Sequence, residues 1–376
     1  NTLFDKIADG KAYINKYRHL SNMRYINKDT SMEFVLGESR LNWASTETGY
    51  YDLQTIQTLA RTSIQIPAWR SNAPGEGAMD FPTIEILPQN HTLTGNGTKT
   101  LLLNIKLGEQ SILNDSQVAA LNDVRDTGAA VIPRTQYLGL FGVVEGTINN
   151  VVLKEPKLIL EEDDVTSYGD LRGAGLLCGM DAGTISQITI DSLKNTVNIV
   201  LGDRTEDGSK GAAVGGIAGI LAESAVPVTK LTMKGDIQVH FPISKALESE
   251  QGIGGIFGYG KVNVASAMAI QECKNSANIT GNMYTGGIVG QLKNTGTVEN
   301  NVVNCFNTGL VLCDDGTYAA DTQEGKYFGG IVGYGDNIQI QKSVNASGTN
   351  RGYKYKTADE ELLCGQYVGG ILGYSK

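Results

Sequence analysis

Histidine is scarce in this chain of 376 residues, which has only His19, His91 and His240. None of the three has a second ligand at metal spacing, and no two of the five cysteines form a C-x-x-C sequence. Zinc and thiol redox sites depend on such spacings. The scattered histidines also give no support to a serine or cysteine nucleophile with a histidine base. We therefore expect no catalytic residue, no metal site and no cofactor.

Positive charge is also in deficit, with 31 Lys and Arg against 40 Asp and Glu and a net charge of -9. Nucleic acids and anionic membranes both attract basic surfaces, so neither is an expected partner. No stretch approaches the roughly 18 consecutive apolar residues of a membrane span. The chain begins at Asn1 without a signal-peptide pattern. We expect no membrane insertion within this segment, and any signal peptide or anchor to lie outside it.

Glycine, by contrast, is abundant: the 47 glycines are roughly twice what an average usage of about 7% would give. Seven segments share one G-G-I-x-G-type pattern, and five match it in full. They are Leu138–Gly142, Gly175–Gly179, Gly215–Gly219, Gly254–Gly258, Gly286–Gly290, Gly329–Gly333 and Gly369–Gly373. Their closing glycines are 32 to 43 residues apart. Such a period is typical of stacked supersecondary units.

Each repeat alternates apolar runs with turn sequences. In one unit the runs 176–180, 184–190 and 196–201 are separated by Asp181–Gly183 and Ser192–Asn195. Three short strands per period predict one coil of a parallel β-helix. Equivalent residues of neighbouring coils would then stack about 4.8 Å apart.

Two ladders of like residues follow from this stacking. Asn275, Asn307 and Asn345 occupy corresponding places, where asparagine can bond neighbouring backbone at a coil corner. Cys273 and Cys305 also correspond. Their Cα atoms would lie within disulfide range, but their side chains would point in parallel, which favours buried free thiols over a bridge.

The paired glycines of the repeat need a reason of their own, because glycine weakens a strand by roughly 0.5 to 1 kcal/mol relative to alanine. Either the backbone bends sharply there, or another strand packs too close for a side chain. The sequence leaves both alternatives open. In either case, replacing Gly287 by valine is predicted to disrupt a coil.

Residues 1 to 80 lack the repeat and are predicted to form a capping region. Apolar residues from Tyr13 to Arg24 recur at helical spacing, and residues 33–36 and 63–66 are strand-like. A solenoid must cover its terminal coil, and an amphipathic helix suits that task. The solenoid is expected to span 81–376, with a chain that continues beyond residue 376.

The seven glycine segments resemble the repeats of the GLUG-repeat proteins of bacterial surfaces, whose motif is a Gly-Gly-Leu/Ile-Val-Gly strand followed by an Asn- and Gly-rich return. The lead-in, with His19–Tyr25, Phe81–Ile84 and Leu93–Gly97, is also similar. The resemblance implies a right-handed, pectin-lyase-like β-helix on or outside the cell surface, with an adhesive or cell-envelope role. Leu138 and Leu176 depart from the motif, and 314–326 is an insertion.

Few residues suggest a ligand site. Tyr259, Tyr334 and Tyr374 each follow a closing glycine and could form an aromatic file on which a glycan stacks. Stacking of the rings on one another is the favoured alternative, because Gln291 holds the same position in the intervening unit. The densest acidic run, Glu161–Asp164, is expected to be a solvated loop rather than a calcium site.

The sequence thus favours an all-β, non-enzymatic surface protein: an adhesin or a structural stalk. Its partner would be an unidentified host or microbial glycan or surface protein, bound through loops between coils. The alternatives are a carbohydrate-active enzyme, a polysaccharide lyase or hydrolase, with clustered acidic and basic residues in a groove, and a pure spacer.

Overall fold

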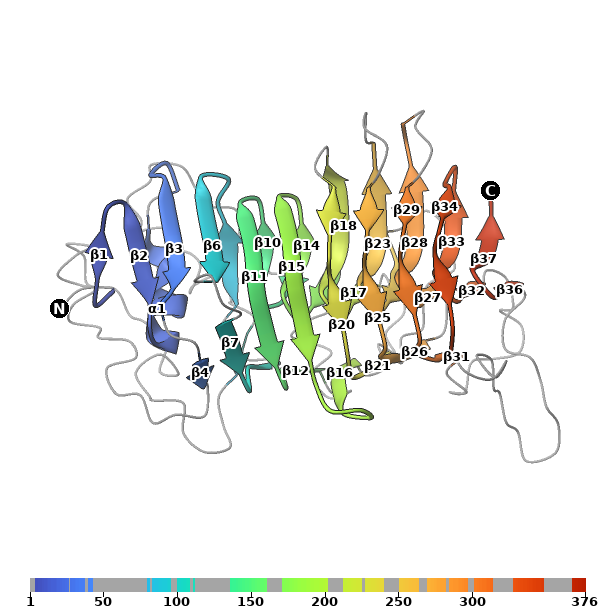
Figure 1. The fold of residues 1–376 in the computed structure, drawn as a ribbon, viewed down its shortest axis with the longest axis horizontal. Helices are drawn as coiled ribbons and strands as arrows, with labels where there is room; N and C mark the ends of the chain where they lie inside the picture. The colour runs from blue at the N-terminus through green and yellow to red at the C-terminus, as the bar shows by residue number, and fades with distance from the viewer. Residues whose placement is uncertain are drawn as a thin grey trace.

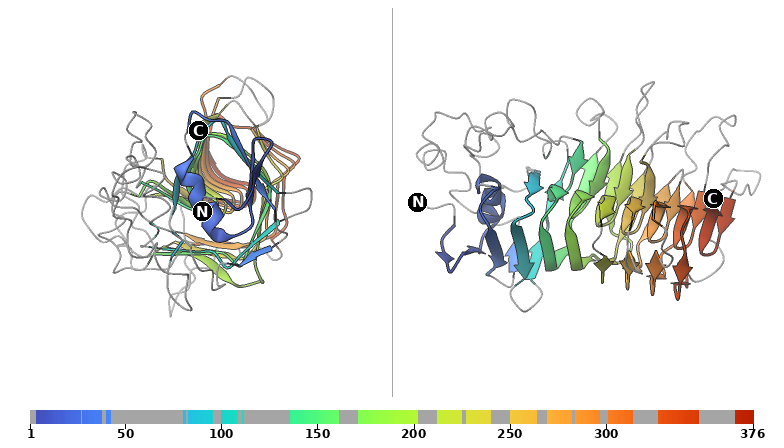
Figure 2. Two further views of the ribbon diagram at one scale, coloured as in Figure 1. Left: turned by 90° about the vertical axis from the view of Figure 1, so that its left-hand side faces the viewer. Right: turned by 90° about the horizontal axis from the view of Figure 1, so that it is seen from above.

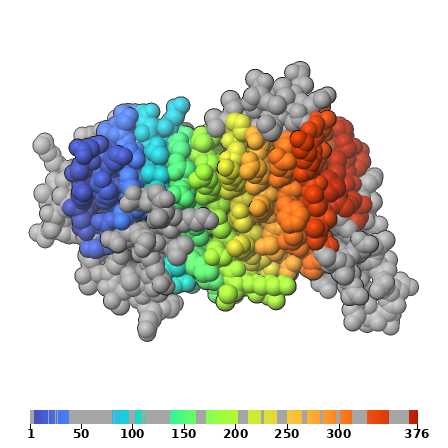
Figure 3. All heavy atoms as spheres, viewed as in Figure 1, coloured from blue at the N-terminus to red at the C-terminus, as the bar shows by residue number. Residues whose placement is uncertain are grey.

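The computed structural model describes residues 4–26, 28–37, 40–42, 80–81, 83–95, 100–108, 111, 136–160, 171–201, 212–224, 227–239, 250–263, 269–281, 284–296, 301–313, 327–347 and 367–376. The molecule is an elongated stack of coils, with β1 at one end and β37 at the other (Figure 1). Successive coils form successive bands across its surface (Figure 3). The described structure is nearly all β, and its strands pair in parallel, apart from β1 and β2. The expected all-β, parallel class is confirmed.

Four sheets run along the stack. The largest contains β1 (Ile7–Ala8), β2 (Lys11–Ile14), β3 (Met32–Leu36), β4 (Arg40–Asn42), β6 (His91–Gly95), β7 (Thr100–Leu103), β11 (Thr147–Lys154), β15 (Thr184–Asp191), β19 (Val228–Thr229), β20 (Thr232–Met233), β24 (Ile270–Gln271), β25 (Lys274–Asn275), β29 (Val302–Val303), β30 (Phe306–Asn307), β34 (Ile340–Gln341) and β35 (Val344–Asn345). A second sheet contains β5 (Ile84–Leu87), β10 (Phe141–Val144), β14 (Cys178–Asp181), β18 (Ala218–Ser224), β23 (Phe257–Val262), β28 (Val289–Asn294), β33 (Val332–Asp336) and β37 (Leu372–Ser375).

The other two sheets are smaller. One contains β8 (Lys106–Leu107), β12 (Lys157–Leu160), β16 (Val197–Leu201), β21 (Asp236–Val239), β26 (Asn278–Gly281) and β31 (Val311–Cys313). The last contains β9 (Tyr137–Leu138), β13 (Gly173–Gly175), β17 (Ala213–Gly215), β22 (Gly252–Gly254), β27 (Thr285–Gly286), β32 (Tyr327–Gly329) and β36 (Tyr367–Gly369). In the second sheet the residue before each closing glycine pairs with its counterpart one period on, as Val289 does with Val332.

The expectation of three strands per coil is wrong, because the glycine segment does not form one strand. Its first glycine ends a strand of the fourth sheet, and the residue after the isoleucine begins a strand of the second sheet. Gly286, for example, ends β27, and Val289 begins β28. The chain therefore bends within each G-G-I-x-G segment, and a full coil passes through four sheets.

Both proposed reasons for the paired glycines apply. A Cβ atom on Gly286 would collide with the carbonyl oxygen of Val289 across the bend. A Cβ atom on Gly287 would collide with the carbonyl oxygen of Gly330 in the next coil and lie 2.5 Å from Cγ of Asn307. The first position thus requires glycine for the bend, and the second for close packing.

The interior of the coils is a continuous apolar core, to which nearly every coil contributes inward-facing Ile, Leu, Val or Phe. At one corner the core is lined by the predicted asparagine ladder, which is confirmed: Asn275 pairs with Asn307, and Asn307 with Asn345. The free-thiol interpretation is confirmed for Cys273 and Cys305, which are both buried and unbridged.

Helix α1 (Tyr17–Asn22) and the short 3-10 helix η1 (Met23–Tyr25) lie at the first end of the stack, where α1 crosses the open coil (Figure 2). The helical pattern was expected to begin at Tyr13, but Tyr13 and Ile14 belong to β2. β2 pairs with β3, and β3 with β6, all in parallel, so the stacking continues upstream of residue 81. The strand expected at 63–66 lies outside the described residues.

Candidate functional site

Tyr259, Tyr334 and Tyr374 lie in one outward-facing row of the second sheet. Tyr259 pairs with Gln291, Gln291 with Tyr334, and Tyr334 with Tyr374 on successive strands. The row also contains Met180 and Ile220 in earlier coils, which are outside the main core. The three tyrosines therefore share one register row, in which Gln291 separates Tyr259 from Tyr334 and Tyr374.

The closing glycine places this row on the outside. Val289 and Leu292 of β28 both belong to the core, although they are three residues apart rather than two. An ideal strand alternates its faces at every residue, so the strand must be irregular at Gly290. The irregularity turns Gln291, and its equivalents Tyr334 and Tyr374, away from the core.

Two further tyrosines join the file from the other side of the bend. Tyr284 precedes β27, and Tyr327 begins β32, in the fourth sheet. The rings of Tyr284 and Tyr327 stack with centroids 5.3 Å apart, and those of Tyr334 and Tyr374 with centroids 5.4 Å apart. Tyr334 also meets Tyr284 and Tyr327 edge-on, at 5.6 and 5.1 Å. We call Tyr284, Tyr327, Tyr334 and Tyr374 the tyrosine cluster.

Sequence reasoning missed Tyr284 and Tyr327, although a signal was present. Each lies two residues before the first glycine of its repeat, and Tyr367 has the same place in the last repeat. Tyr327 pairs with Tyr367 in the structure. The position two residues before the glycine pair is therefore a second tyrosine file, parallel to the predicted one.

The tyrosine cluster has a buried base and a more accessible rim. Tyr284 is 1% exposed and Tyr327 8% exposed, whereas Tyr334 and Tyr374 are half-buried. Burial, with the neighbouring phenols of Tyr327 and Tyr334, raises the pKa of Tyr284. Burial and then the nearby Asp336 raise the pKa of Tyr334. Near neutral pH these hydroxyls are therefore uncharged and can both donate and accept hydrogen bonds.

Tyr259 does not belong to the cluster. Its ring packs in a separate apolar patch with Ala213 and Ile220 and is 6% exposed. Burial, followed by the charge of Glu250, raises the pKa of Tyr259 to about 12. Of the three predicted aromatics, the structure thus brings Tyr334 and Tyr374 together and places Tyr259 elsewhere.

Charged and amide side chains border the cluster. Lys293 on β28 pairs in register with Asp336 on β33, two residues beyond Gln291 and Tyr334 respectively. Gln291 is buried, and its Oε1 atom has no hydrogen-bond partner within the part of the chain that the structure describes. An aromatic surface bordered by an amide and by charges of both signs is suited to a polar ligand with apolar faces.

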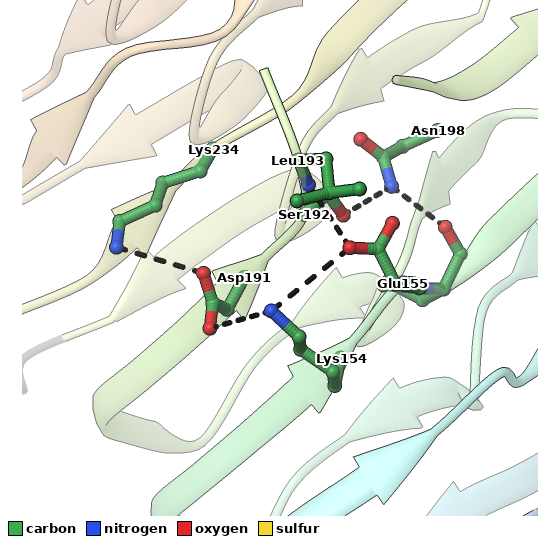
Figure 4. Close-up of polar contacts among 8 residues, drawn as sticks. Lys154, Glu155, Asp191, Ser192, Leu193, Asn198 and Lys234 are labelled. Carbon is green, nitrogen blue, oxygen red and sulfur yellow. Dashed lines mark hydrogen bonds and ion pairs between the residues drawn. The ribbon is translucent and has the colours of Figure 1, made fainter. Parts of the chain in front are cut away.

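A second group of polar residues lies at the corner where β11 and β15 end (Figure 4). Asp191 forms two ion pairs: its Oδ2 atom lies 3.1 Å from Nζ of Lys154, and its Oδ1 atom lies 3.6 Å from Nζ of Lys234. Glu155 accepts the backbone N–H of Leu193 at 2.9 Å. We call Lys154, Glu155, Asp191 and Lys234 the charged corner. Its carboxylates are engaged by neighbouring coils, as in a structural ion-pair ladder.

The same corner is fixed by uncharged contacts. Asn198 is fully buried and donates from Nδ2 to the carbonyl oxygen of Pro156 at 2.8 Å and to the hydroxyl of Ser192 at 2.7 Å (Figure 4). These bonds hold the turn after β15 against the preceding coil.

The histidines that the structure describes have structural surroundings. His19 is buried beside Asp5, with 3.4 Å between Nε2 and Oδ1, and accepts the backbone N–H of Asn15 on Nδ1. His91 is buried with Nε2 2.8 Å from the carbonyl oxygen of Thr30. Among the described residues, no three His, Cys, Asp or Glu side chains are grouped as a metal site would require.

His240 and the acidic run Glu161–Asp164, which the sequence analysis considered as possible ligands, lie outside the described residues. In the part of the chain that is described, no helix has the length and apolar character needed to cross a membrane.

Comparison with known proteins gives little further information. No family model matches the chain, and no curated protein matches it. One similar solved structure is that of a "putative immunoglobulin A1 protease" from Bacteroides ovatus, which is 16% identical with a TM-score of 0.46. The alignment covers 100% of this chain and 87% of that one. This likeness is too distant to assign an activity.

Proposed function

We propose that this chain is a non-enzymatic cell-surface module, a rigid solenoidal stalk whose outer surface carries an adhesive site. The single observation that carries the proposal is the parallel stacking itself. The second sheet runs without a break from β5 to β37, through eight strands, and three further sheets brace it. A stack in which each coil contacts its neighbours over four sheets suits a load-bearing spacer.

A carbohydrate-active enzyme would need acidic and basic side chains gathered at one place, and the charged corner is one such place among the described residues. There Asp191 is held between two lysines, and Glu155 is hydrogen-bonded to backbone. A general acid or base must reach its substrate, and these carboxylates already bind protein groups. This occupancy supports a structural role for the corner.

The resemblance of the G-G-I-x-G repeat to GLUG-repeat proteins supports the location, outside a bacterial cell, and the class, a pectin-lyase-like β-helix. We take its coil to be right-handed, because crossovers between parallel strands of one sheet are right-handed in about 98% of cases.

Location is tested directly on the bacterium that makes the protein. Intact cells are treated with an impermeant protease and probed with antibodies to the chain, with a cytoplasmic protein as control. The proposal expects this chain to be removed while the control survives. Survival of both proteins on intact cells, followed by digestion of both after lysis, would refute the surface location.

A further inference from the structure

The tyrosine cluster is not required by the fold. Tyr284 and Tyr327 each lie one residue before a paired position of the fourth sheet, where Ile253 pairs with Thr285 and Thr285 with Phe328. The same place holds Gly252, Ala213 and Gly173 in three earlier coils, and Tyr137 in the coil before them. The three coils with glycine or alanine stack in the same way with little or no side chain at this position. The four rings also lie outside the core that the solenoid shares. Their presence is therefore additional to what the coil needs.

The cluster combines features that a structural patch would not need. Among the described residues, the buried hydroxyl of Tyr284 has no hydrogen-bond partner, and neither has Oε1 of Gln291. An unpaired buried polar group costs free energy, roughly 1 to 3 kcal/mol, and a purely structural patch would gain by being apolar there. Phenylalanine would preserve the ring packing of Tyr284. The retained hydroxyl and amide point to a polar ligand that binds against the rings.

The surroundings narrow the chemistry of that ligand. A stack of rings presents apolar faces and edges, which match the C–H faces of a sugar, while phenol, amide and charged groups match its hydroxyls. Lys293 and Asp336 are neighbours of opposite sign, so this border does not select an anion. Nucleic acid and acidic peptide would require an excess of basic side chains.

From this arrangement we infer that the tyrosine cluster binds neutral oligosaccharides built of pyranose rings. Tyr334 and Tyr374 at the rim contact the sugar, Tyr284 and Tyr327 hold those rings from beneath, and Gln291 donates and accepts hydrogen bonds at the edge. The inference deepens the proposed adhesive role, on which it rests, by naming the ligand class and the site. The corresponding file in earlier coils, with glycine or alanine opposite Met180 and Ile220, lacks this surface.

The test uses the whole chain on a printed array of neutral, uronic-acid-containing and sialylated oligosaccharides. The Tyr334→Ser/Tyr374→Ser variant is compared with Tyr137→Ser, which changes a tyrosine on β9 of the fourth sheet, several coils away from the cluster. We expect retention of neutral oligosaccharides by the wild type and by Tyr137→Ser, and at least about a ten-fold loss of affinity in the double variant. No neutral retention by the wild type, or equal retention by all three proteins, overturns the inference.

A second measurement does not depend on the folding of a variant. Addition of a retained oligosaccharide to the wild-type chain should perturb the ultraviolet difference spectrum of tyrosine, because the rim rings leave water. An unchanged spectrum at saturating sugar overturns the site. The protease treatment of intact cells is independent of both results. A surface-located chain without sugar binding would thus refute this inference alone.

Discussion

The side-chain amide of Asn275 donates a hydrogen bond to the side-chain oxygen of Asn307, one coil further on, over 2.8 Å. Asn307 in turn donates to Asn345 over 2.9 Å, and its remaining donor bonds the carbonyl oxygen of Gly309 at 2.9 Å. Both donor hydrogens of this fully buried amide are therefore used. The ladder links three coils through groups that water cannot reach.

Replacing Asn307 by alanine should destabilise the chain by roughly 1 to 3 kcal/mol, because Asn275 and the backbone of Gly309 lose buried partners. Urea unfolding measures the change. Lys274→Ala, on the exposed face of the same corner, is the control and should stay within about 0.5 kcal/mol of the wild type. Equal midpoints for the two variants would mean that the ladder contributes nothing.

Gly287 and Gly370 occupy the same place in different repeats but differ in their surroundings. A Cβ atom on Gly287 meets Gly330 and Asn307, whereas one on Gly370 has no atom of the described residues within 4 Å. We therefore expect Gly287→Val to lower the thermal midpoint strongly or prevent folding, and Gly370→Val to leave it nearly unchanged. Circular dichroism melting distinguishes them. An unchanged midpoint for Gly287→Val would refute the close-packing explanation.

Asp181 is fully buried, between Val144 and Leu221 of the neighbouring strands. Burial raises the pKa of its carboxyl from 3.8 to about 7, although the backbone N–H of Gly183 bonds it. Because the folded state keeps the proton that the unfolded state releases, stability falls as pH rises from 3.8 to 7 and is level above. Three pKa units correspond to about 4 kcal/mol.

The variant Asp181→Asn should therefore unfold at a higher urea concentration than the wild type at pH 8, and the two should converge near pH 4. Asp191→Asn is a suitable control, since its carboxylate is half-exposed and paired with lysines. That control should gain no stability at pH 8. If Asp181→Asn is as stable as the wild type at both pH values, folding does not raise the pKa of this carboxyl.

A buried ion pair joins the cap to the first coil. Arg24 of η1 lies 3.3 Å from Glu85 of β5, and both side chains are almost completely buried. Arg24→Ala should cost about 3 to 5 kcal/mol by removing the cation beside a buried carboxylate, and Arg24→Met/Glu85→Leu should recover most of that loss. Chemical unfolding of both variants measures this. A double variant less stable than Arg24→Ala would contradict the reasoning.

Much of the architecture could be predicted from the repeat. Its period places Asn275, Asn307 and Asn345 in one ladder, because parallel stacking brings equivalent positions together. The sequence offered a bend and close packing as alternative reasons for the paired glycines, but it could not assign either reason to a residue. Gly286 and Gly287 are the same residue type but require glycine for different causes: Gly286 lies in the bend, and Gly287 packs against Asn307. Only the folded coil separates those two causes.

The candidate site was predictable in part for the same reason. Tyr334 and Tyr374 share an offset from the closing glycine, so their pairing follows from the period. Their contact with Tyr284 and Tyr327 depends on the angle between two sheets at the bend. A sequence read as one straight strand cannot bring those residues together. The helix also begins later than its apolar spacing predicts, at Tyr17 rather than Tyr13. Tyr13 and Ile14 belong to β2, because the pairing of β2 with β3 outweighs the local helical periodicity.

The central claim, that the chain binds rather than cleaves carbohydrate, is tested by incubating the wild-type protein with the neutral oligosaccharides that the array retains. Mass spectrometry of the sugar before and after incubation gives the chain length. The account predicts bound sugar recovered at its original length. Shortened products, lost when Asp191 or Glu155 of the charged corner is replaced, would contradict it and favour a carbohydrate-active enzyme.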